Sequence, residues 1–151
     1  MGRGIAQMAA QAGATVWLLD TLPGAAEAAR TALEGTWAAL VAKQRMAADA
    51  ATDCTARLRI ASGMADLAVC DLVVEAIVER LDVKQKVFAE LEAIVGPDAV
   101  LATNTSSLSV TAIAAALKRP QRFAGWHFFN PVPLMKVVEV IAGLKTDAAV
   151  C

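Results

Sequence analysis

His127 is the only histidine of this 151-residue chain, and its setting suggests acid–base chemistry. It ends a predicted strand over Arg122–His127, and ligand-binding side chains gather at such strand ends in open α/β sheets. Glu139 follows twelve positions later on the next predicted strand, within reach of the imidazole across the intervening turn. A carboxylate there would favour the charged imidazole and fix its tautomer, as a general acid–base needs. A structural histidine with satisfied hydrogen bonds is the other interpretation.

Short polar side chains follow another predicted strand, Val100–Thr103, in the run Asn104-Thr105-Ser106-Ser107. They could bind a substrate hydroxyl or a carboxamide, or they could cap the helix that comes next. Glu79 and Lys84 come soon after a further strand, where a solvated ion pair is the alternative to a binding role. Glu75, inside that apolar strand, needs a partner when buried, and the sequence assigns it no role.

Asp20 closes the apolar run Ala14–Leu19, which is typical of a strand buried on both faces. An acid at this place can accept hydrogen bonds from both hydroxyls of an adenosine ribose and so favour NAD over NADP. It can equally cap the helix that follows. Gly2 and Gly4 fit a close approach of the backbone to a neighbouring strand or to a pyrophosphate.

The elements that must position these residues alternate along the chain. The predicted helices cover residues 2–13, 23–44, part of 47–56, 80–95 and 108–117, and the predicted strands cover 14–19, 58–61, 71–77, 100–103, 122–127 and 136–141. Gly13 is expected to end the first helix, and Pro23 suits the first turn of the second. Phe128 and Phe129 are expected in the core. Such alternation predicts an α/β fold, a doubly wound and mostly parallel sheet with helices on both faces. One domain over residues 1–151 is the simplest organisation.

Composition excludes several classes of protein. A hydrophobic content of 57% is incompatible with intrinsic disorder, and 14 Lys and Arg against 15 Asp and Glu leave no basic surface for nucleic acid or an anionic membrane. No stretch predicts a membrane span or a secretory leader. The three cysteines are scattered, without the spacing of a metal site, and predict a reducing, cytoplasmic setting and no bound metal.

Five segments together resemble the nucleotide-binding domain of the L-3-hydroxyacyl-CoA dehydrogenase family. They are Met1–Ala6 (MGRGIA), Asp71–Glu79 (DLVVEAIVE), Asn104–Leu108 (NTSSL), Phe123–Pro133 (FAGWHFFNPVP) and Lys136–Val140 (KVVEV). The resemblance spans almost the whole chain, in order and with similar spacing, and the His-Phe-Phe-Asn-Pro block is its most specific part. The Asn-Pro-Val-Pro form is similar to that of the 3-hydroxybutyryl-CoA and 3-hydroxyadipyl-CoA enzymes.

The resemblance implies a Rossmann-type fold and an NAD-dependent enzyme that oxidises the 3-hydroxyl of an L-3-hydroxyacyl-CoA, in fatty-acid or aromatic-acid degradation. His127 would take the hydroxyl proton, Glu139 would orient the imidazole, and Ser106 would bind the substrate oxygen beside the nicotinamide. The other residues it implies are Met1, Gly2, Asp20, Glu79, Lys84, Asn104 and Asn130 for NAD, and Thr36 and Lys43 for coenzyme A.

Two departures from the family bear on activity. In the family a first strand and a Gly-rich turn precede the Met-Gly pair, here Met1-Gly2, and a helical C-terminal domain that forms the homodimer follows. The chain is therefore expected to be a fragment with weak NAD binding and low turnover by itself. Two alternatives stay open, a catalytically impaired Rossmann-type binding module and a dehydrogenase of a hydroxy acid without coenzyme A.

Overall fold

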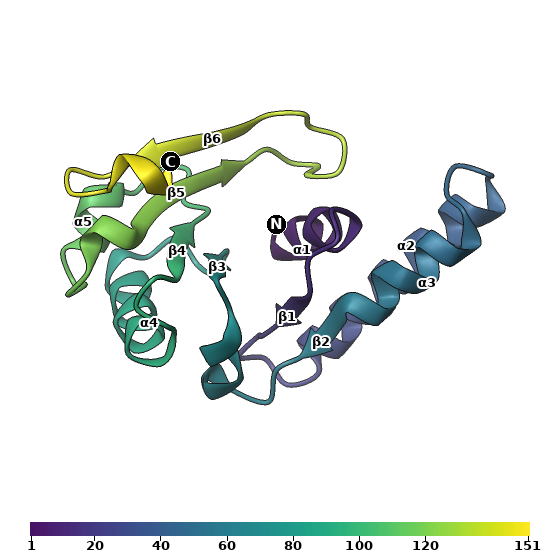
Figure 1. The fold of residues 1–151 in the computed structure, drawn as a ribbon, viewed down its shortest axis with the longest axis horizontal. Coiled ribbons are helices and arrows are strands. Elements are labelled where there is room, and N and C mark those ends of the chain that lie inside the picture. The colour runs from purple at the N-terminus through teal and green to yellow at the C-terminus, as the bar shows by residue number, and fades with distance from the viewer. The chain divides into compact units, whose positions relative to one another are not determined.

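The computed structural model describes residues 1–151 (Figure 1). The chain forms two compact units. Residues 3–63 make one unit, and residues 64–151 together with Met1 and Gly2 make the other. Each unit combines helices with strands, so the α/β class expected from the sequence is confirmed. No helix has both the length and the apolar character that crossing a bilayer requires.

The unit of residues 3–63 is a helix-rich βαβ arrangement. It contains α1 (Gly2–Gln11), β1 (Val16–Leu18), α2 (Ala25–Ala42), α3 (Ala48–Arg57) and β2 (Leu58–Ile60). The two strands are parallel, with Val16 opposite Leu58. Gly13 ends α1 at φ 99°, a left-handed conformation that glycine adopts without strain. α2 begins two residues later than Pro23 because Gly24, at φ 79°, is not helical.

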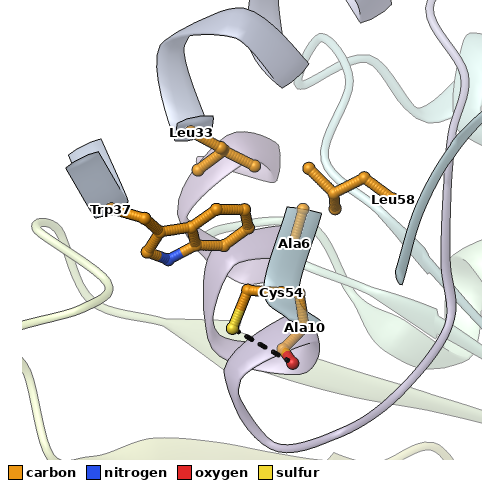
Figure 2. Packing of buried hydrophobic residues seen from close by; sticks show 6 residues of the cluster. All are labelled: Ala6, Ala10, Leu33, Trp37, Cys54 and Leu58. Carbon is orange, nitrogen blue, oxygen red and sulfur yellow. Dashed lines mark hydrogen bonds between the residues drawn. The ribbon is translucent and has the colours of Figure 1, made fainter. Parts of the chain in front are cut away.

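A small apolar core holds this unit together (Figure 2). Its buried members come from every element except β1: Ala6, Ala10, Leu33, Trp37, Cys54 and Leu58. The Cys54 thiol lies 3.8 Å from the Ala10 carbonyl oxygen, which also accepts a hydrogen bond from Arg57 at 3.2 Å. Trp37 is 1% exposed, so the aromatic ring of α2 is the centre of the packing.

The other unit is built on a four-stranded sheet of order β3-β4-β5-β6. Its strands are β3 (Leu72–Glu75), β4 (Val100–Thr103), β5 (Phe123–Phe128) and β6 (Val138–Ala142), and its α-helices are α4 (Leu81–Ile94) and α5 (Val110–Ala114). Short 3-10 helices cover Met64–Val69, Pro120–Arg122 and Ala148–Val150. β3, β4 and β5 are parallel, whereas β5 and β6 form the long antiparallel hairpin visible in Figure 1.

Both α-helices of this unit pack on one face of its sheet. Phe88 of α4 meets Phe123 of β5 edge to face, with ring centroids 4.7 Å apart. Two residues along β5, on the same face, a Cβ on Gly125 would lie 2.9 Å from Val110 of α5. Glycine is therefore required for α5 to approach the sheet.

The structure differs from the sequence-based expectation in two respects. The strands form two separate sheets, one of β1 and β2 and one of β3 to β6, because no strand of the chain pairs with a member of each. α5 is shorter than the predicted 108–117 at both ends. The Ser109 hydroxyl caps its start by accepting a hydrogen bond from the Ala112 N–H at 3.2 Å, and beyond Ala114 the N–H groups of Ala116 and Leu117 bond three residues back, as in a 3-10 turn. All other predicted helices and strands are present, with ends shifted by a few residues.

Candidate active site

His127 and Glu139 face each other across the hairpin. They are direct partners in the antiparallel register of β5 and β6, and the imidazole Nδ1 lies 2.7 Å from the Glu139 Oε2. The His127 side chain is 20% exposed and that of Glu139 is 53% exposed. When the carboxylate accepts the Nδ1–H, Nε2 is the ring nitrogen left to exchange a proton with another molecule.

Phe129 lies beside this pair. Its ring centroid is 4.7 Å from that of the imidazole, at an interplanar angle of 58°. The sequence suggested a core position for this residue, but its side chain is only half-buried and packs against the histidine. The signal was present in the spacing, because residues i and i+2 of an extended chain project to the same side.

Asn104 connects the end of β4 to the end of β5. Its side-chain oxygen accepts a hydrogen bond from the Phe128 N–H at 2.9 Å, and its backbone N–H donates to the Glu75 backbone carbonyl at 2.8 Å. The amide oxygen is thus used next to His127, and the amide NH₂ is the group available to a ligand.

The loop Thr105–Ser107 is organised by one carboxylate, that of Glu79. Glu79 Oε1 accepts hydrogen bonds from the Thr105 hydroxyl, from the Ser106 N–H at 3.1 Å, and from the N–H and hydroxyl of Ser107, both at 3.2 Å. Thr105 Oγ1 in turn accepts the Leu108 N–H at 3.0 Å. The exposed Ser106 hydroxyl makes no hydrogen bond within the chain, so the loop presents it to solvent with its backbone fixed.

Glu79 stays ionised in this arrangement. Partial burial by itself would raise the pKa of Glu79, but the hydrogen bond from Thr105 and the nearby ammonium of Lys84 outweigh that effect. Together with the Ser107 N–H they lower the pKa of this carboxyl to about 2. At neutral pH the loop is therefore held by a full negative charge.

Lys84 lies behind Glu79 and is 1% exposed. Its Nζ is 2.6 Å from Glu75 Oε1 and 3.3 Å from Glu79 Oε2. Glu75 Oε2 accepts the Thr103 hydroxyl at 2.7 Å, and its Oε1 also accepts the Ile77 N–H at 2.6 Å. Glu75, to which the sequence gave no role, is thus the buried partner of a lysine for which the resemblance implied a cofactor contact.

The remaining residues implied by the resemblance lie elsewhere. Asn130 is exposed and precedes Pro131 through a cis peptide bond. Gly2 begins α1, and a Cβ added to it would lie 3.8 Å from the Ala76 Cβ, just beyond β3. The exposed Met1 precedes it.

Three of these residues belong to the unit of residues 3–63. Asp20 follows β1, and its Oδ1 accepts the Leu22 N–H at 2.9 Å, which leaves Oδ2 for a ligand. Thr36 and Lys43 are exposed and lie two turns apart at the C-terminal half of α2, on one side of the helix. No cluster of side chains suited to a metal ion is present.

Comparison with known proteins places the whole chain in one family. The family model described as 3-hydroxyacyl-CoA dehydrogenase, NAD binding domain, matches residues 1–151. The 3-hydroxybutyryl-CoA dehydrogenase of Bradyrhizobium diazoefficiens is 46% identical over 149 residues, covering 99% of this chain and 51% of the relative. The 3-hydroxyadipyl-CoA dehydrogenase of Escherichia coli is 46% identical over 153 residues, covering 99% of this chain and 32% of the relative.

Solved structures agree with this assignment. The crystal structure of 3-hydroxybutyryl-CoA dehydrogenase from Escherichia coli matches with a TM-score of 0.97 at 44% identity, over 99% of this chain and 32% of that one. The enzyme from Ralstonia eutropha matches with a TM-score of 0.94 at 37% identity, over 99% of this chain and 53% of that one. The chain thus spans between about a third and about a half of the length of these relatives. Its Rossmann-type fold and its sequence agree, and the chain belongs to the 3-hydroxyacyl-CoA dehydrogenase family, in the NAD-binding domain.

Proposed function

We propose that the whole protein to which these residues belong oxidises the 3-hydroxyl of an L-3-hydroxyacyl-CoA to a ketone, with NAD as the oxidant. The observation that carries this proposal is the His127–Glu139 pair at 2.7 Å, next to a loop that presents a free serine hydroxyl. Acid–base pairs of this kind serve many enzymes, and the relationship to 3-hydroxybutyryl-CoA dehydrogenases selects the reaction.

In this mechanism His127 is the general base. Its Nε2 takes the proton of the 3-hydroxyl as the C3–H bond breaks, and Glu139 stabilises the imidazolium that forms. When bound, NAD accepts the hydride from C3. Loss of the proton and the hydride converts the 3-hydroxyacyl-CoA into a 3-oxoacyl-CoA. The reverse reaction uses the same groups in the opposite sense.

Ser106 and Asn104 complete the substrate side of the proposal. The Ser106 hydroxyl donates a hydrogen bond to the substrate oxygen, and its fixed backbone keeps that donor in place. Asn104, whose amide oxygen is bonded to the Phe128 N–H and whose NH₂ is left for a ligand, is assigned to the cofactor together with Asn130.

Five further residues, Met1, Gly2, Asp20, Thr36 and Lys43, are assigned to the ligands on the family resemblance. Asp20 has one carboxylate oxygen without a protein partner, which suits the hydroxyls of an adenosine ribose. Met1 and Gly2 are assigned to the cofactor, Gly2 because its missing side chain allows close approach. Lys43 offers a cation for the phosphates of coenzyme A, whereas the Thr36 hydroxyl donates to the Ala32 carbonyl at 2.9 Å and keeps its lone pairs to accept a hydrogen bond from the same ligand.

Four further features remain part of the proposal. Residues 1–151 make up the NAD-binding domain, and the homodimer contacts and the rest of the acyl-CoA site lie in the part of the relatives that this chain does not cover. A place in fatty-acid degradation follows from the same relationship. A cytoplasmic location rests on the three free cysteines.

The experiment is NADH formation from L-3-hydroxybutyryl-CoA, with the parent compared to His127→Gln in a chain extended at both ends to the length of its relatives. We expect the variant to lose about 100-fold or more in kcat, because it lacks the acid–base group. NAD binding and the unfolding transition serve as controls for the fold. A variant rate within a few-fold of the parent refutes the proposed role, and NAD binding without turnover in the parent favours the impaired binding module.

A further inference from the structure

A line of charged and polar groups runs from the core of the sheet to the loop that carries Ser106. It starts at Thr103 of β4, continues through Glu75 of β3 and Lys84 of α4, and ends at Glu79. The Glu75 and Lys84 side chains are 2% and 1% exposed, whereas that of Glu79 is 37% exposed. A fixed interior pair thus stands behind a carboxylate that water can reach.

The two carboxylate oxygens of Glu79 contact different groups. Oε1 receives the donors of the loop, and Oε2 faces the Lys84 ammonium at 3.3 Å. A carboxylate at the surface rotates and binds water unless a second contact fixes it, because ordering such a side chain costs conformational entropy. Lys84 supplies that second contact, and it is itself immobile because Glu75 holds its ammonium at 2.6 Å.

Glu75 is well suited to hold the lysine. Its Oε2 accepts the Thr103 hydroxyl, and its Oε1 accepts the Ile77 N–H in addition to the ammonium. Both carboxylate oxygens are thereby satisfied, so the buried charge has the hydrogen bonds that it needs. The position of Lys84 is consequently set by two adjacent strands, β3 and β4.

We propose that Glu75 and Lys84 are positioning residues of the dehydrogenase reaction, which act through Glu79 to hold the loop Thr105–Ser107 and with it the Ser106 hydroxyl. This inference rests on the proposed function, since it assigns the two residues to the site that contains His127 and Ser106. Neither residue touches the substrate. A loop that shifts moves the serine donor away from the oxygen it serves, and a misplacement of about 1 Å can lower kcat by roughly 100-fold.

The test uses a change that keeps the interior neutral and filled, the double variant Glu75→Gln/Lys84→Met, in the chain extended at both ends. Lys86→Met is the matched control, because Lys86 is exposed on the same helix and undergoes the same substitution. We expect the double variant to lose roughly 10-fold in kcat. The control variant keeps the parent values.

A cycle with Ser106→Ala separates positioning from a general structural effect. If the pair acts through Ser106, the double variant lowers kcat by less than about 2-fold when Ser106 is already alanine, because the two changes remove the same contribution. Equal losses in both backgrounds overturn the inference, and so does a double variant with parent kcat. If the double variant does not fold, Glu75→Gln/Lys84→Gln takes its place in the cycle, because it also leaves the interior neutral but keeps groups that can hydrogen-bond, and the same two outcomes decide.

The two proposals fail in different ways. If His127→Gln and Ser106→Ala both leave the rate unchanged, the proposed function itself is wrong. If these two variants are impaired while the pair shows no coupling to Ser106, only the positioning role of Glu75 and Lys84 is refuted.

Discussion

Replacing Lys84 alone by methionine tests how the interior of the sheet tolerates a charge without its partner. The substitution leaves the Glu75 carboxylate buried at 2% side-chain exposure, with its ammonium at 2.6 Å removed. Breaking a buried ion pair from one side costs about 3–5 kcal/mol of unfolding free energy. Because Thr103 and the Ile77 N–H still donate to Glu75, we expect the lower end of this range, about 3 kcal/mol.

The assay is equilibrium unfolding in urea at pH 7, followed by tryptophan fluorescence and repeated by thermal unfolding. For a protein of this size a loss of about 3 kcal/mol corresponds to a Tm lower by roughly 6–12 °C. The double variant Glu75→Gln/Lys84→Met should return to within about 1 kcal/mol of the parent, since no unpaired charge remains inside. Arg30→Met, which breaks a pair with side chains 39% and 38% exposed, should cost less than about 0.5 kcal/mol.

Two results would refute this reasoning. A loss below about 1 kcal/mol in Lys84→Met would show that the pair is not buried as the structure places it. A double variant as unstable as the single one would show that the lysine stabilises by its packing and not by neutralising Glu75.

Three further predictions concern the rest of the unit. Glu139→Gln should lower kcat by about 10²- to 10⁴-fold in the NADH assay, because an amide cannot stabilise the imidazolium of His127. Folding lowers the pKa of Glu79 from 4.5, its ordinary value in the unfolded chain, to about 2. The ionised carboxylate therefore contributes stability that is fully present above pH 4.5 and is lost as the pH falls through about 2. The difference in unfolding free energy between the parent and Glu79→Gln should therefore be constant above about pH 5 and shrink below it. Gly125→Ala should cost about 1–3 kcal/mol in urea unfolding, because the new Cβ would lie 2.9 Å from Val110.

The secondary structure was largely predictable because local signals and packing agree along most of the chain. Glycines and prolines mark the element ends, and short apolar runs read as buried strands. The length of α5 was not predictable from periodicity, because individual hydrogen bonds decide where the α-helix begins, at Ser109, and where it gives way to 3-10 turns, after Ala114. The division of the strands into two sheets depends on hydrogen bonds between segments distant in the sequence, which local sequence patterns do not predict.

The acid–base pair was accessible from sequence for a simple reason. His127 and Glu139 lie on consecutive strands joined by a short connection, so a register that pairs them is one of few possibilities. The packing of Phe129 on the imidazole was accessible by the same argument, from its spacing of two residues, but the apolar side chain suggested the core instead.

The interior pair behind the loop was only half visible in the sequence. Lys84 precedes Phe88 by four residues and Leu91 by seven, which places it on the buried face of α4, and all three are buried. A lysine on such a face requires a buried anion, and Glu75 is one of two carboxylates inside predicted apolar strands, the other being Glu139, which already has His127 as its expected partner. Periodicity therefore predicts that both charges are buried, but it does not predict that they meet, since the contact depends on how α4 lies on the sheet.

The loop that follows β4 needs support from another segment of the chain. Ser106 and Ser107 are exposed, and the buried Thr105 is a small polar residue, so the conformation of the loop has to be imposed by hydrogen bonds. Glu79 imposes it from the segment that follows β3, and its low pKa means that this control persists throughout the range in which a histidine exchanges protons. Protonation at His127 can thus change with the reaction while the serine donor stays where the carboxylate holds it. Release of the loop by protonation of Glu79 should consequently require strongly acidic pH.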